Sequence, residues 1–360
     1  MSRQEPDIRI PVVVVGQTPP PVHGQALAIQ RLVNANFKRI AIHHVRMNFS
    51  DRMADVGRFR LRKIGALACL IRRVVQVRAA TGARVLYYPP AGSHLLPVLR
   101  DMAFLSAVRP LFPRLVFDIH ASGLETIEPR LPGPMRGLFR SCFHGANLLI
   151  EKYPSSRPHP LHPRRCVVVP NGIEDVFSTF STVLRGRSSF TVLYVGMLAP
   201  SKGIWTLLDA VSLLRTKGMD VRAVFVGEFA SPHVAAEWVT KLRQLRLESC
   251  VFHKGRLTGN DKWQEFCKAD VFCLPSHNEV QPLAIIEAMQ FSLPVVSSDW
   301  RGIGHLVTDG ISGFVVPQRD SGAIADRLER LARDRSLREQ MGNNGRRLFL
   351  RRYTLEAHLR

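Results

Sequence analysis

The hydrophobic pattern of the chain alternates between short apolar runs and longer stretches with helical spacing. Residues 10–15 are almost continuously apolar and rich in valine, as expected of a strand buried on both faces of a parallel sheet. A turn and a helical stretch, residues 26–33, follow it. The same alternation recurs along the chain and predicts an α/β fold. The predicted strands are residues 10–15, 40–45, 85–88, 115–119, 148–150, 166–169, 190–195, 221–226, 251–254, 271–275 and 294–296.

The alternation is interrupted once, which predicts two domains. Residues 177–189 are small and polar without clear periodicity, so we assign them to a linker. The linker separates an N-terminal domain, residues 1–176, from a C-terminal domain, residues 190–340, and a final helix spans 341–360. A length of 360 residues is enough for two domains with cores of their own. Each should be a doubly wound sheet with ligands at the carboxyl ends of its strands.

The stretch from residue 276 to residue 298 carries the strongest candidate chemistry. Pro282 suits the first position of a helix, so Glu279 should lie on the loop before that helix and Glu287 about one and a half turns inside it. Backbone N–H groups from Val280 to Ala284 would point outward there and form an anion site for phosphate. The two carboxylates are better suited to accept hydrogen bonds from sugar hydroxyls.

Two further turns join a predicted strand to a helix. After residues 190–195 come Gly196, Lys202 and a helix from about residue 203, which places a cation beside a helix N-terminus and suits a pyrophosphate. After residues 10–15 comes G-Q-T-P-P-P-V-H-G-Q, in which Gly24 allows close approach of the backbone to a ligand. His23 in this loop is either an acceptor-side residue or polar loop filler, and Gln25 is its acceptor-side companion.

Charge points to a partner of negative charge. The chain has 50 Lys and Arg against 29 Asp and Glu, and residues 1–180 hold 25 basic and 11 acidic residues. No nucleic-acid-binding motif occurs, so we expect no nucleic-acid partner. Residues 58–77 form a basic amphipathic helix whose apolar face, including Ile64 and Val75, we expect to be buried, while its arginines can contact anionic lipid.

Cysteine spacing and hydropathy favour a cytoplasmic location. None of the six cysteines forms a C-x2-C pair, so neither a zinc site nor a disulfide framework is indicated. Residues 1–9 are polar, and the longest uncharged apolar run, residues 64–71, is far too short to cross a bilayer. We expect a cytoplasmic protein that can be peripheral on the inner face of the plasma membrane.

The pair Glu279-x7-Glu287 followed by A-M-x-x-x-x-P-V-V resembles the donor-binding signature of family 4 glycosyltransferases with the GT-B fold. The strings P-P-P-x-x-G and P-N-G-I-E, the second containing Asn171 and Gly172, also resemble loops of that family. The string ending at Lys202 resembles its G-R-x-x-x-x-K-G, except that Met197 occupies the usual Arg position, which leaves open whether another cation substitutes.

The resemblance implies specific roles for residues of this chain. Glu279 and His120, which follows the strand predicted at 115–119, would contact the donor sugar, and Lys202 would stabilise the diphosphate; these three are the candidate catalytic residues. Glu287 would hold the nucleotide ribose. The remaining donor-side candidates are Gly24, Gly196, Arg256 near the base, Val280, Pro282 and Leu283.

The implied fold is GT-B: two doubly wound Rossmann-like domains that face each other across a cleft, with the last helix crossing back to the first domain. The implied function is a retaining, metal-independent transfer of a hexosyl-type sugar from a nucleotide-diphosphate sugar to a glycan or lipid-linked glycan. The strings are most similar to those of bacterial exopolysaccharide and glycolipid enzymes. No cofactor is implied, and no D-x-D motif occurs.

Two alternatives remain at this point. A GT-B nucleotide-sugar epimerase would act without an acceptor. A non-catalytic basic protein on a GT-B scaffold would bind nucleic acid or membrane in a salt-dependent way.

Overall fold

The computed structural model describes residues 9–20, 24–47, 49, 62–155, 158–180 and 189–360. The chain divides into two compact units, Met1–Val169 and Pro170–Arg360. Each unit contains a six-stranded sheet in which every described pairing is parallel. This confirms the predicted α/β architecture with two doubly wound sheets.

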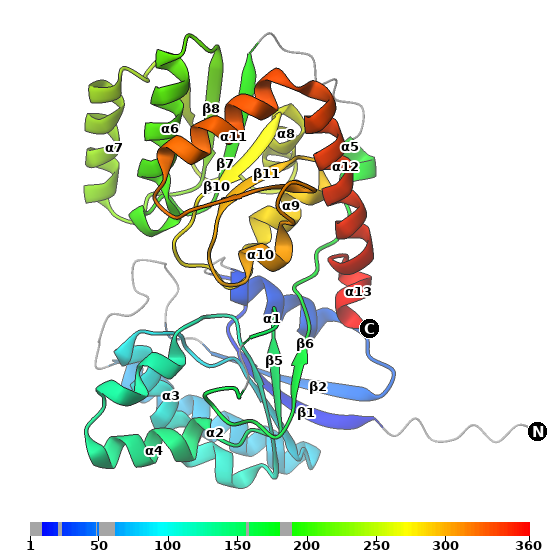
Figure 1. Ribbon diagram of the computed structural model, residues 1–360. Coiled ribbons are helices and arrows are strands. Elements are labelled where there is room, and N and C mark those ends of the chain that lie inside the picture. The colour runs from blue at the N-terminus through cyan, green and yellow to red at the C-terminus, as the bar shows by residue number, and fades with distance from the viewer. Residues whose placement is uncertain (1–8, 21–23, 48, 50–61, 156–157, 181–188) are drawn as a thin grey trace, which may run out of the picture. The chain divides into compact units, whose positions relative to one another are not determined.

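Unit 1 has the strand order β2-β1-β3-β4-β5-β6. Its strands are β1 Ile10–Gly16, β2 Ile40–Arg46, β3 Val85–Tyr88, β4 Arg114–Asp118, β5 Leu148–Glu151 and β6 Cys166–Val168. Its helices are α1 Gly24–Asn34, α2 Arg62–Thr81, α3 Leu95–Val108 and α4 Gly133–Phe143. Helices α2, α3 and α4 pack side by side on one face of the sheet (Figure 1). Right-handed crossovers put α1 on the other face, since the chain reverses direction across the sheet after β2.

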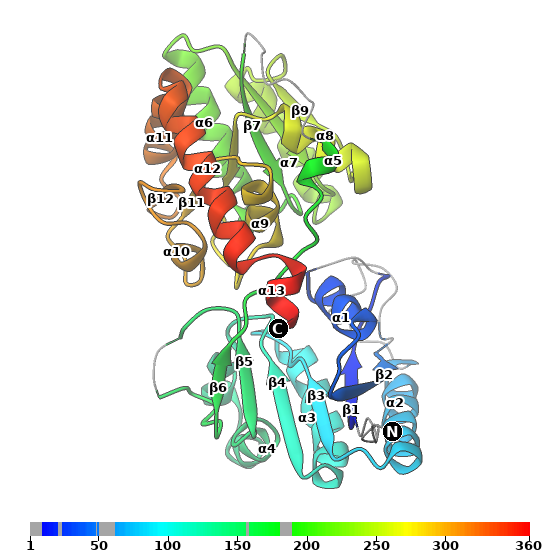
Figure 2. The same cartoon turned by 90° about the vertical axis from the view of Figure 1, so that its right-hand side faces the viewer.

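Unit 2 has the strand order β12-β11-β10-β7-β8-β9. Its strands are β7 Phe190–Val195, β8 Val221–Val226, β9 Val251–His253, β10 Val271–Leu274, β11 Val295–Ser298 and β12 Gly313–Val316. Its helices are α5 Phe177–Phe180, α6 Ile204–Thr216, α7 Pro232–Leu245, α8 Gly259–Lys268, α9 Leu283–Gln290, α10 Ile303–Leu306, α11 Ser321–Arg333, α12 Arg335–Arg352 and α13 Leu355–Leu359. Helix α6 packs between α7 and α11, and α9 packs against α12 (Figure 2).

Burial explains why the strands were recognisable in the sequence. All four residues of β10 and all four of β11 are buried, because helices cover both faces of the sheet. The order of the strands places the topological switch point between β7 and β10 in unit 2, and between β1 and β3 in unit 1. Ligands of doubly wound sheets bind beside such points, at the carboxyl ends of the strands.

The two units divide earlier than the predicted boundary at residue 176. Ile173 forms a parallel bridge with Thr354, and its backbone N–H donates to the Tyr353 carbonyl at 2.9 Å. Residues 170–176 therefore group with unit 2, as do the C-terminal helices α12 and α13. The first part of the predicted linker forms α5, and residues 181–188 lie outside the described residues. The return of the last helix to the first domain stays a prediction.

Three local predictions need correction. The Asn-Gly pair at residues 171–172 predicts a tight turn, but none forms: the Asn171 backbone N–H donates to the Gln281 side chain, and the chain continues in irregular conformation. Residues 341–360 are not one final helix: residues 341–352 belong to α12, which the Asp334 side chain caps, and α13 begins after Tyr353 and Thr354. On α2, Leu70 and Val74 are buried, whereas Ile64 and Val75 are exposed.

Candidate functional site

The switch point of unit 2 brings together two residues that the sequence separates widely. Lys202 follows β7, and Glu279 follows β10, the strand paired with β7. The Lys202 ammonium donates to Glu279 Oε1 at 2.5 Å and to the Asn278 carbonyl at 3.0 Å. Both charged side chains keep about one fifth of their surface exposed, 22% and 20%. The ion pair is therefore reachable by a ligand at the carboxyl edge of the sheet.

Close backbone packing fixes the loop that carries Lys202 against the loop that carries Glu279. Gly203 has φ of +75°, and a Cβ there would lie 2.0 Å from the Pro275 carbonyl oxygen, so only glycine fits. The Ser201 carbonyl accepts hydrogen bonds from the backbone N–H of His277 at 2.9 Å and from the Ser276 hydroxyl at 3.3 Å. Lys202 and Glu279 thus rest on two loops that cannot shift independently.

The helix after Glu279 begins as predicted, within one residue. Pro282 is the N-cap of α9 rather than its first residue, and Leu283 is the first. Among the described residues no side chain caps this end, so the head of α9 keeps free N–H groups. Val280 is buried, which anchors the loop. The same end therefore carries the partial positive charge that an anion site needs.

Glu287 lies inside α9 and is paired with a lysine that sequence reasoning missed. Lys262 of α8 donates to Glu287 Oε1 at 2.8 Å, and its ammonium lies 4.0 Å from the centre of the Trp263 ring. Glu287 is 8% exposed. A buried carboxylate with an ammonium partner stays a hydrogen-bond acceptor, as contact with a ribose hydroxyl would require.

The remaining predicted donor residues of unit 2 lie on loops that follow its strands. Gly196 directly follows β7, and a Cβ on Gly227 would lie 1.9 Å from its carbonyl oxygen. Met197 is 41% exposed at the position where the family pattern has an Arg. Arg256 follows β9 and is in a different ion pair, with Glu228 at 3.9 Å. A further cation, Arg319 after β12, adds to burial in lowering the pKa of His277.

In unit 1 the loop after β1 is held by a residue that the sequence did not single out. The Arg46 guanidinium donates to the Pro20 carbonyl at 3.0 Å. Gly24 is the first residue of α1, and Gln25 follows it, half-buried. His23 lies outside the described residues. The predicted acceptor-side role of His23 and Gln25 stays a prediction.

His120 follows β4 and belongs to a buried polar network. Its Nε2 lies 2.7 Å from Asp118 Oδ2, and the Lys152 ammonium lies 2.6 Å from Asp118 Oδ1. The Tyr87 hydroxyl donates to the same Asp118 carboxylate. Burial acts to raise the pKa of Asp118, but His120 and Lys152 outweigh it and hold that pKa well below its usual range. Burial, assisted by Lys152, lowers the pKa of His120, so the imidazole is neutral at pH 7.

Comparison with known proteins shows what the region around the unit 2 site is similar to. Residues 182–348, which contain Lys202, Glu279 and Glu287, match the family described as Glycosyl transferases group 1. This match lies within unit 2 and covers less than half of the chain. It is 29% identical over 164 residues to the capsular polysaccharide biosynthesis glycosyltransferase CapM of Staphylococcus aureus, covering 44% of this chain and 41% of that protein. It is 32% identical over 167 residues to the alpha-D-kanosaminyltransferase of Streptomyces kanamyceticus, covering 46% and 42%. These matches thus span less than half the length of either relative.

Solved glycosyltransferase structures share the whole fold. Sucrose-phosphate synthase from Thermosynechococcus elongatus superposes with a TM-score of 0.72 at 16% identity, covering 98% of this chain and 96% of that one. Anabaena HepE in complex with UDP superposes with a TM-score of 0.69 at 18% identity, covering 97% of each chain. At this identity the likeness shows the fold alone. The architecture of the chain is therefore GT-B.

Several polar residues of the sites were missed by sequence reasoning. Asp118 had a signal, since it stands two residues before His120 at the end of one strand and therefore on the same side of the chain. No signal in the sequence pointed to Lys152, Lys262 or Gln281. Their partners come from strands and helices that only the sheet order brings near, as when Gln281 accepts from the Asn171 backbone N–H at 2.5 Å.

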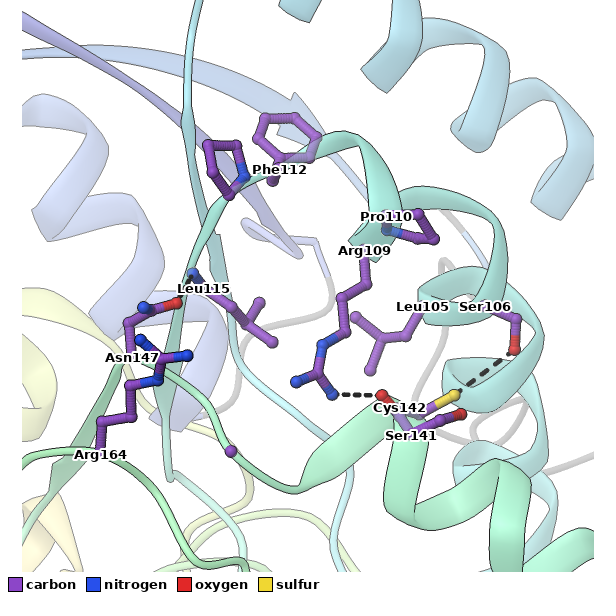
Figure 3. A pocket seen from close by; sticks show the side chains of 12 residues that line it. Leu105, Ser106, Arg109, Pro110, Phe112, Leu115, Ser141, Cys142, Asn147 and Arg164 are labelled. Atoms are coloured by element: carbon purple, nitrogen blue, oxygen red, sulfur yellow. Dashed lines mark hydrogen bonds between the residues drawn. The ribbon is translucent and has the colours of Figure 1, made fainter.

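A hollow of about 430 Å³ in unit 1 lies away from these sites (Figure 3). Arg109 reaches across it and donates to the His144 carbonyl at 2.7 Å, and Asn147 on its wall accepts from the Leu115 backbone N–H at 2.8 Å. Leu115 and Asn147 stand at the amino ends of β4 and β5. The hollow is therefore at the opposite end of these strands from His120, and we assign no donor site to it.

Within the described parts of the chain, no three or more His, Cys, Asp and Glu side chains gather as a metal ion would require. Metal independence stays a prediction. Among the helices that the structure describes, none has the length and apolar character to cross a membrane.

Proposed function

We propose that this protein is a retaining glycosyltransferase that transfers a sugar from a nucleotide-diphosphate sugar to a saccharide acceptor. The observation that carries the proposal is the exposed Lys202–Glu279 ion pair at the switch point of unit 2, inside the matched glycosyltransferase group 1 region. It puts a cation, a hydrogen-bond acceptor and the free N–H groups of α9 at one edge of one sheet. A sugar joined to a diphosphate needs these three groups.

In the proposed reaction the charges of unit 2 act on the leaving diphosphate. Lys202 exchanges Glu279 for the diphosphate and, with the head of α9, stabilises the negative charge that develops as the bond to the sugar breaks. Glu279 then accepts hydrogen bonds from the sugar hydroxyls. The acceptor hydroxyl attacks the face that the diphosphate leaves and passes its proton to the departing diphosphate oxygen, so no nucleophile of the enzyme is needed. These groups supply the positive charge that a metal would otherwise supply.

We further propose that the acceptor is a lipid-linked glycan of a cell-surface polysaccharide. Relatives named for capsular polysaccharide, colanic acid and amylovoran biosynthesis support this acceptor class. The excess of basic residues in residues 1–180 favours a negatively charged acceptor such as a lipid pyrophosphate. On α2, Arg72 and Arg73 are exposed, as is Ile64 at 57%, a combination that suits contact with an anionic membrane surface.

The proposal is tested by the stereochemistry of turnover. Purified protein is supplied with a panel of UDP- and GDP-sugars and a lipid-pyrophosphate saccharide, with and without EDTA, and the product is examined by NMR. We expect one donor to be consumed, EDTA to have no effect, and the product to keep the anomeric configuration of the donor. An inverted product would refute the retaining mechanism. Conversion of the donor to an isomer without acceptor would favour the epimerase instead.

Membrane contact is tested separately by co-sedimentation with vesicles of anionic phosphatidylglycerol or neutral phosphatidylcholine. We expect binding to the anionic vesicles only, and loss of about half of it or more in an Arg72→Glu, Arg73→Glu double variant. Equal binding by the variant would remove α2 from the proposal.

A further inference from the structure

The carboxylate of Asp118 collects hydrogen-bond donors from three neighbouring strand ends of unit 1. Asp118 is the last residue of β4, Tyr87 lies in β3, and Lys152 directly follows β5. Oδ1 faces the Lys152 ammonium at 2.6 Å, and Oδ2 faces His120 Nε2 at 2.7 Å together with the Tyr87 hydroxyl. The side chain of Lys152 is 1% exposed and that of His120 is 5% exposed. Such a buried network is stable only with its donors and acceptors matched.

The network determines which nitrogen of His120 carries the proton. An ionised carboxylate only accepts hydrogen bonds, and the adjacent ammonium keeps Asp118 ionised. His120 Nε2 must therefore be the donor. A neutral imidazole has one N–H, so Nδ1 is left as an acceptor, and within the described residues Nδ1 has no hydrogen-bond partner.

The backbone around His120 is also fixed. A Cβ on Gly92 would lie 2.9 Å from both Ala121 Cβ and the Ser122 carbonyl oxygen, so the loops after β3 and β4 touch at this point. Gly123 has φ of +88°, and a Cβ there would lie 2.7 Å from Ser93 Cβ. The imidazole is therefore held by its own hydrogen bond and by the loop that follows it.

A second histidine–carboxylate pair in unit 1 differs from the His120–Asp118 pair in burial and in its place on the sheet. His144 Nε2 lies 3.1 Å from Glu128 Oε2, but the pair has no buried lysine and lies near the surface, with 20% and 18% of the side chains exposed. It is located at the end of α4, near the hollow at the amino ends of the strands. The Asp118 network, by contrast, is at the carboxyl ends, where doubly wound sheets bind ligands.

We propose that Asp118 is a positioning residue: it accepts the Nε2 proton of His120 and so presents Nδ1 as a hydrogen-bond acceptor to a hydroxyl group of the sugar substrate. This inference rests on the proposed function for the identity of the substrate. Lys152 and Tyr87 support it by holding the Asp118 carboxylate in place. Asp118 itself does not touch the substrate.

The decisive substitution is Asp118→Asn. The amide has only one oxygen, and the Lys152 ammonium attracts it. The amide NH₂ group then points toward His120 Nε2, which must become an acceptor, and the proton moves to Nδ1. The variant thus removes the acceptor offered to the substrate while keeping the size of the side chain.

The first measurement is made on the protein without substrate. Long-range ¹⁵N–¹H NMR correlation, with His120→Gln to assign the signals, reports which ring nitrogen carries the proton at pH 7. We expect the Nε2–H tautomer in the wild type and the Nδ1–H tautomer in Asp118→Asn. Because the wild-type spectrum alone decides the tautomer, the test survives if the variant does not fold. A wild-type imidazole that is charged, or protonated at Nδ1, would overturn the inference.

The second measurement is kinetic and separates this inference from the proposed function. We expect Asp118→Asn to lower kcat about 10- to 100-fold, the factor for one lost hydrogen bond in a site, and Glu128→Gln to leave kcat unchanged. The rate of donor hydrolysis without acceptor shows which substrate carries the hydroxyl. If the hydroxyl belongs to the donor, Asp118→Asn should lower the hydrolysis rate as much as kcat. If it belongs to the acceptor, the hydrolysis rate should not fall. If the wild type transfers sugar and Asp118→Asn does so equally well, the inference fails alone. If the wild type transfers none, the proposed function fails while the tautomer result still stands.

Discussion

We predict that substitutions of the two members of the ion pair in unit 2 affect nucleotide binding differently. Lys202 donates to Glu279 at 2.5 Å in the structure, and the proposed function requires it to exchange that partner for a diphosphate. Replacing Lys202 with Ala removes the cation that the nucleotide needs. Replacing Glu279 with Gln removes only the competing negative charge, and Lys202 keeps its hydrogen bond to the Asn278 carbonyl. The two variants should therefore change nucleotide affinity in opposite directions, or the second should leave it unchanged.

The magnitude follows from the exposure of the pair. A hydrogen bond to a charged group contributes about 1.5–3 kcal/mol, so Lys202→Ala should weaken UDP or GDP binding roughly 10- to 100-fold. Glu279→Gln should leave the affinity equal or raise it, by at most about tenfold, because both side chains are partly solvated. It should nevertheless slow sugar transfer. Partly exposed pairs contribute only about 1 kcal/mol or less to folding, so both variants should fold.

Isothermal titration calorimetry with UDP and GDP is the assay. Lys217→Ala is the matched control, since Lys217 also pairs with carboxylates in unit 2, at 2.8 Å from Glu329 and 3.1 Å from Asp326, but on the outer surface of α6 and α11. It should bind the nucleotide like the wild type. If Glu279→Gln weakened binding as much as Lys202→Ala does, the pair would be a structural unit and the exchange would be refuted. Unchanged binding by Lys202→Ala would remove Lys202 from the donor site.

Three further predictions concern stability. Gly203→Ala should lower Tm by about 5–10 °C, because its Cβ would lie 2.0 Å from the Pro275 carbonyl oxygen. The control Gly218→Ala has a similar φ of +77° but no atom within 4 Å of its Cβ, so it should lower Tm less. Equal shifts in Tm by calorimetry would contradict the packing argument. Gln290→Leu should cost about 1–3 kcal/mol in urea unfolding, because Gln290 Oε1 accepts from the Val176 backbone N–H at 2.5 Å and is fully buried; a cost near zero would mean that this bond does not hold residues 170–176 to α9. Stability should also fall as the pH drops from 7 to 5.5. Burial is the largest cause that lowers the pKa of several histidines in the folded protein, so the same histidines in the unfolded chain, with an ordinary pKa of 6.5, take up protons first and favour unfolding. A Tm independent of pH in this range would contradict this argument. These histidines are His44, His120, His144 and His277.

The sequence predicted the strands well and their order not at all. The predicted strand at 190–195 agrees with β7 Phe190–Val195 because a strand covered on both faces must be apolar throughout. The pairing of β7 with β10 instead of β11 or β12 leaves no such pattern. The same limit applies to the site. Lys202 and Glu279 were each predicted from a strand–turn–helix motif and a family resemblance, but their contact depends on which strands are neighbours.

The resemblance also had no means of finding partners on other elements. Glu287 was predicted, but Lys262 was not, since it lies on α8 and only the packing of α8 beside α9 brings the two together. Amphipathic spacing likewise misplaced the buried face of α2. Leu70 is buried and Ile64 is not.

The two units hold their charged groups in opposite ways, and the difference matches the roles proposed for them. The Lys202–Glu279 pair keeps about one fifth of each side chain exposed, so breaking it costs little and a ligand can replace one partner. The Asp118–Lys152 pair is almost fully buried, so removing either partner leaves an uncompensated charge and is costly. An exchangeable pair suits a group that must bind and release a diphosphate in every cycle. A fixed pair suits a group that must hold one imidazole in one tautomer throughout. Mutations should therefore impair the two sites differently: at Lys202 through binding without loss of stability, and at Lys152 through stability and imidazole orientation together.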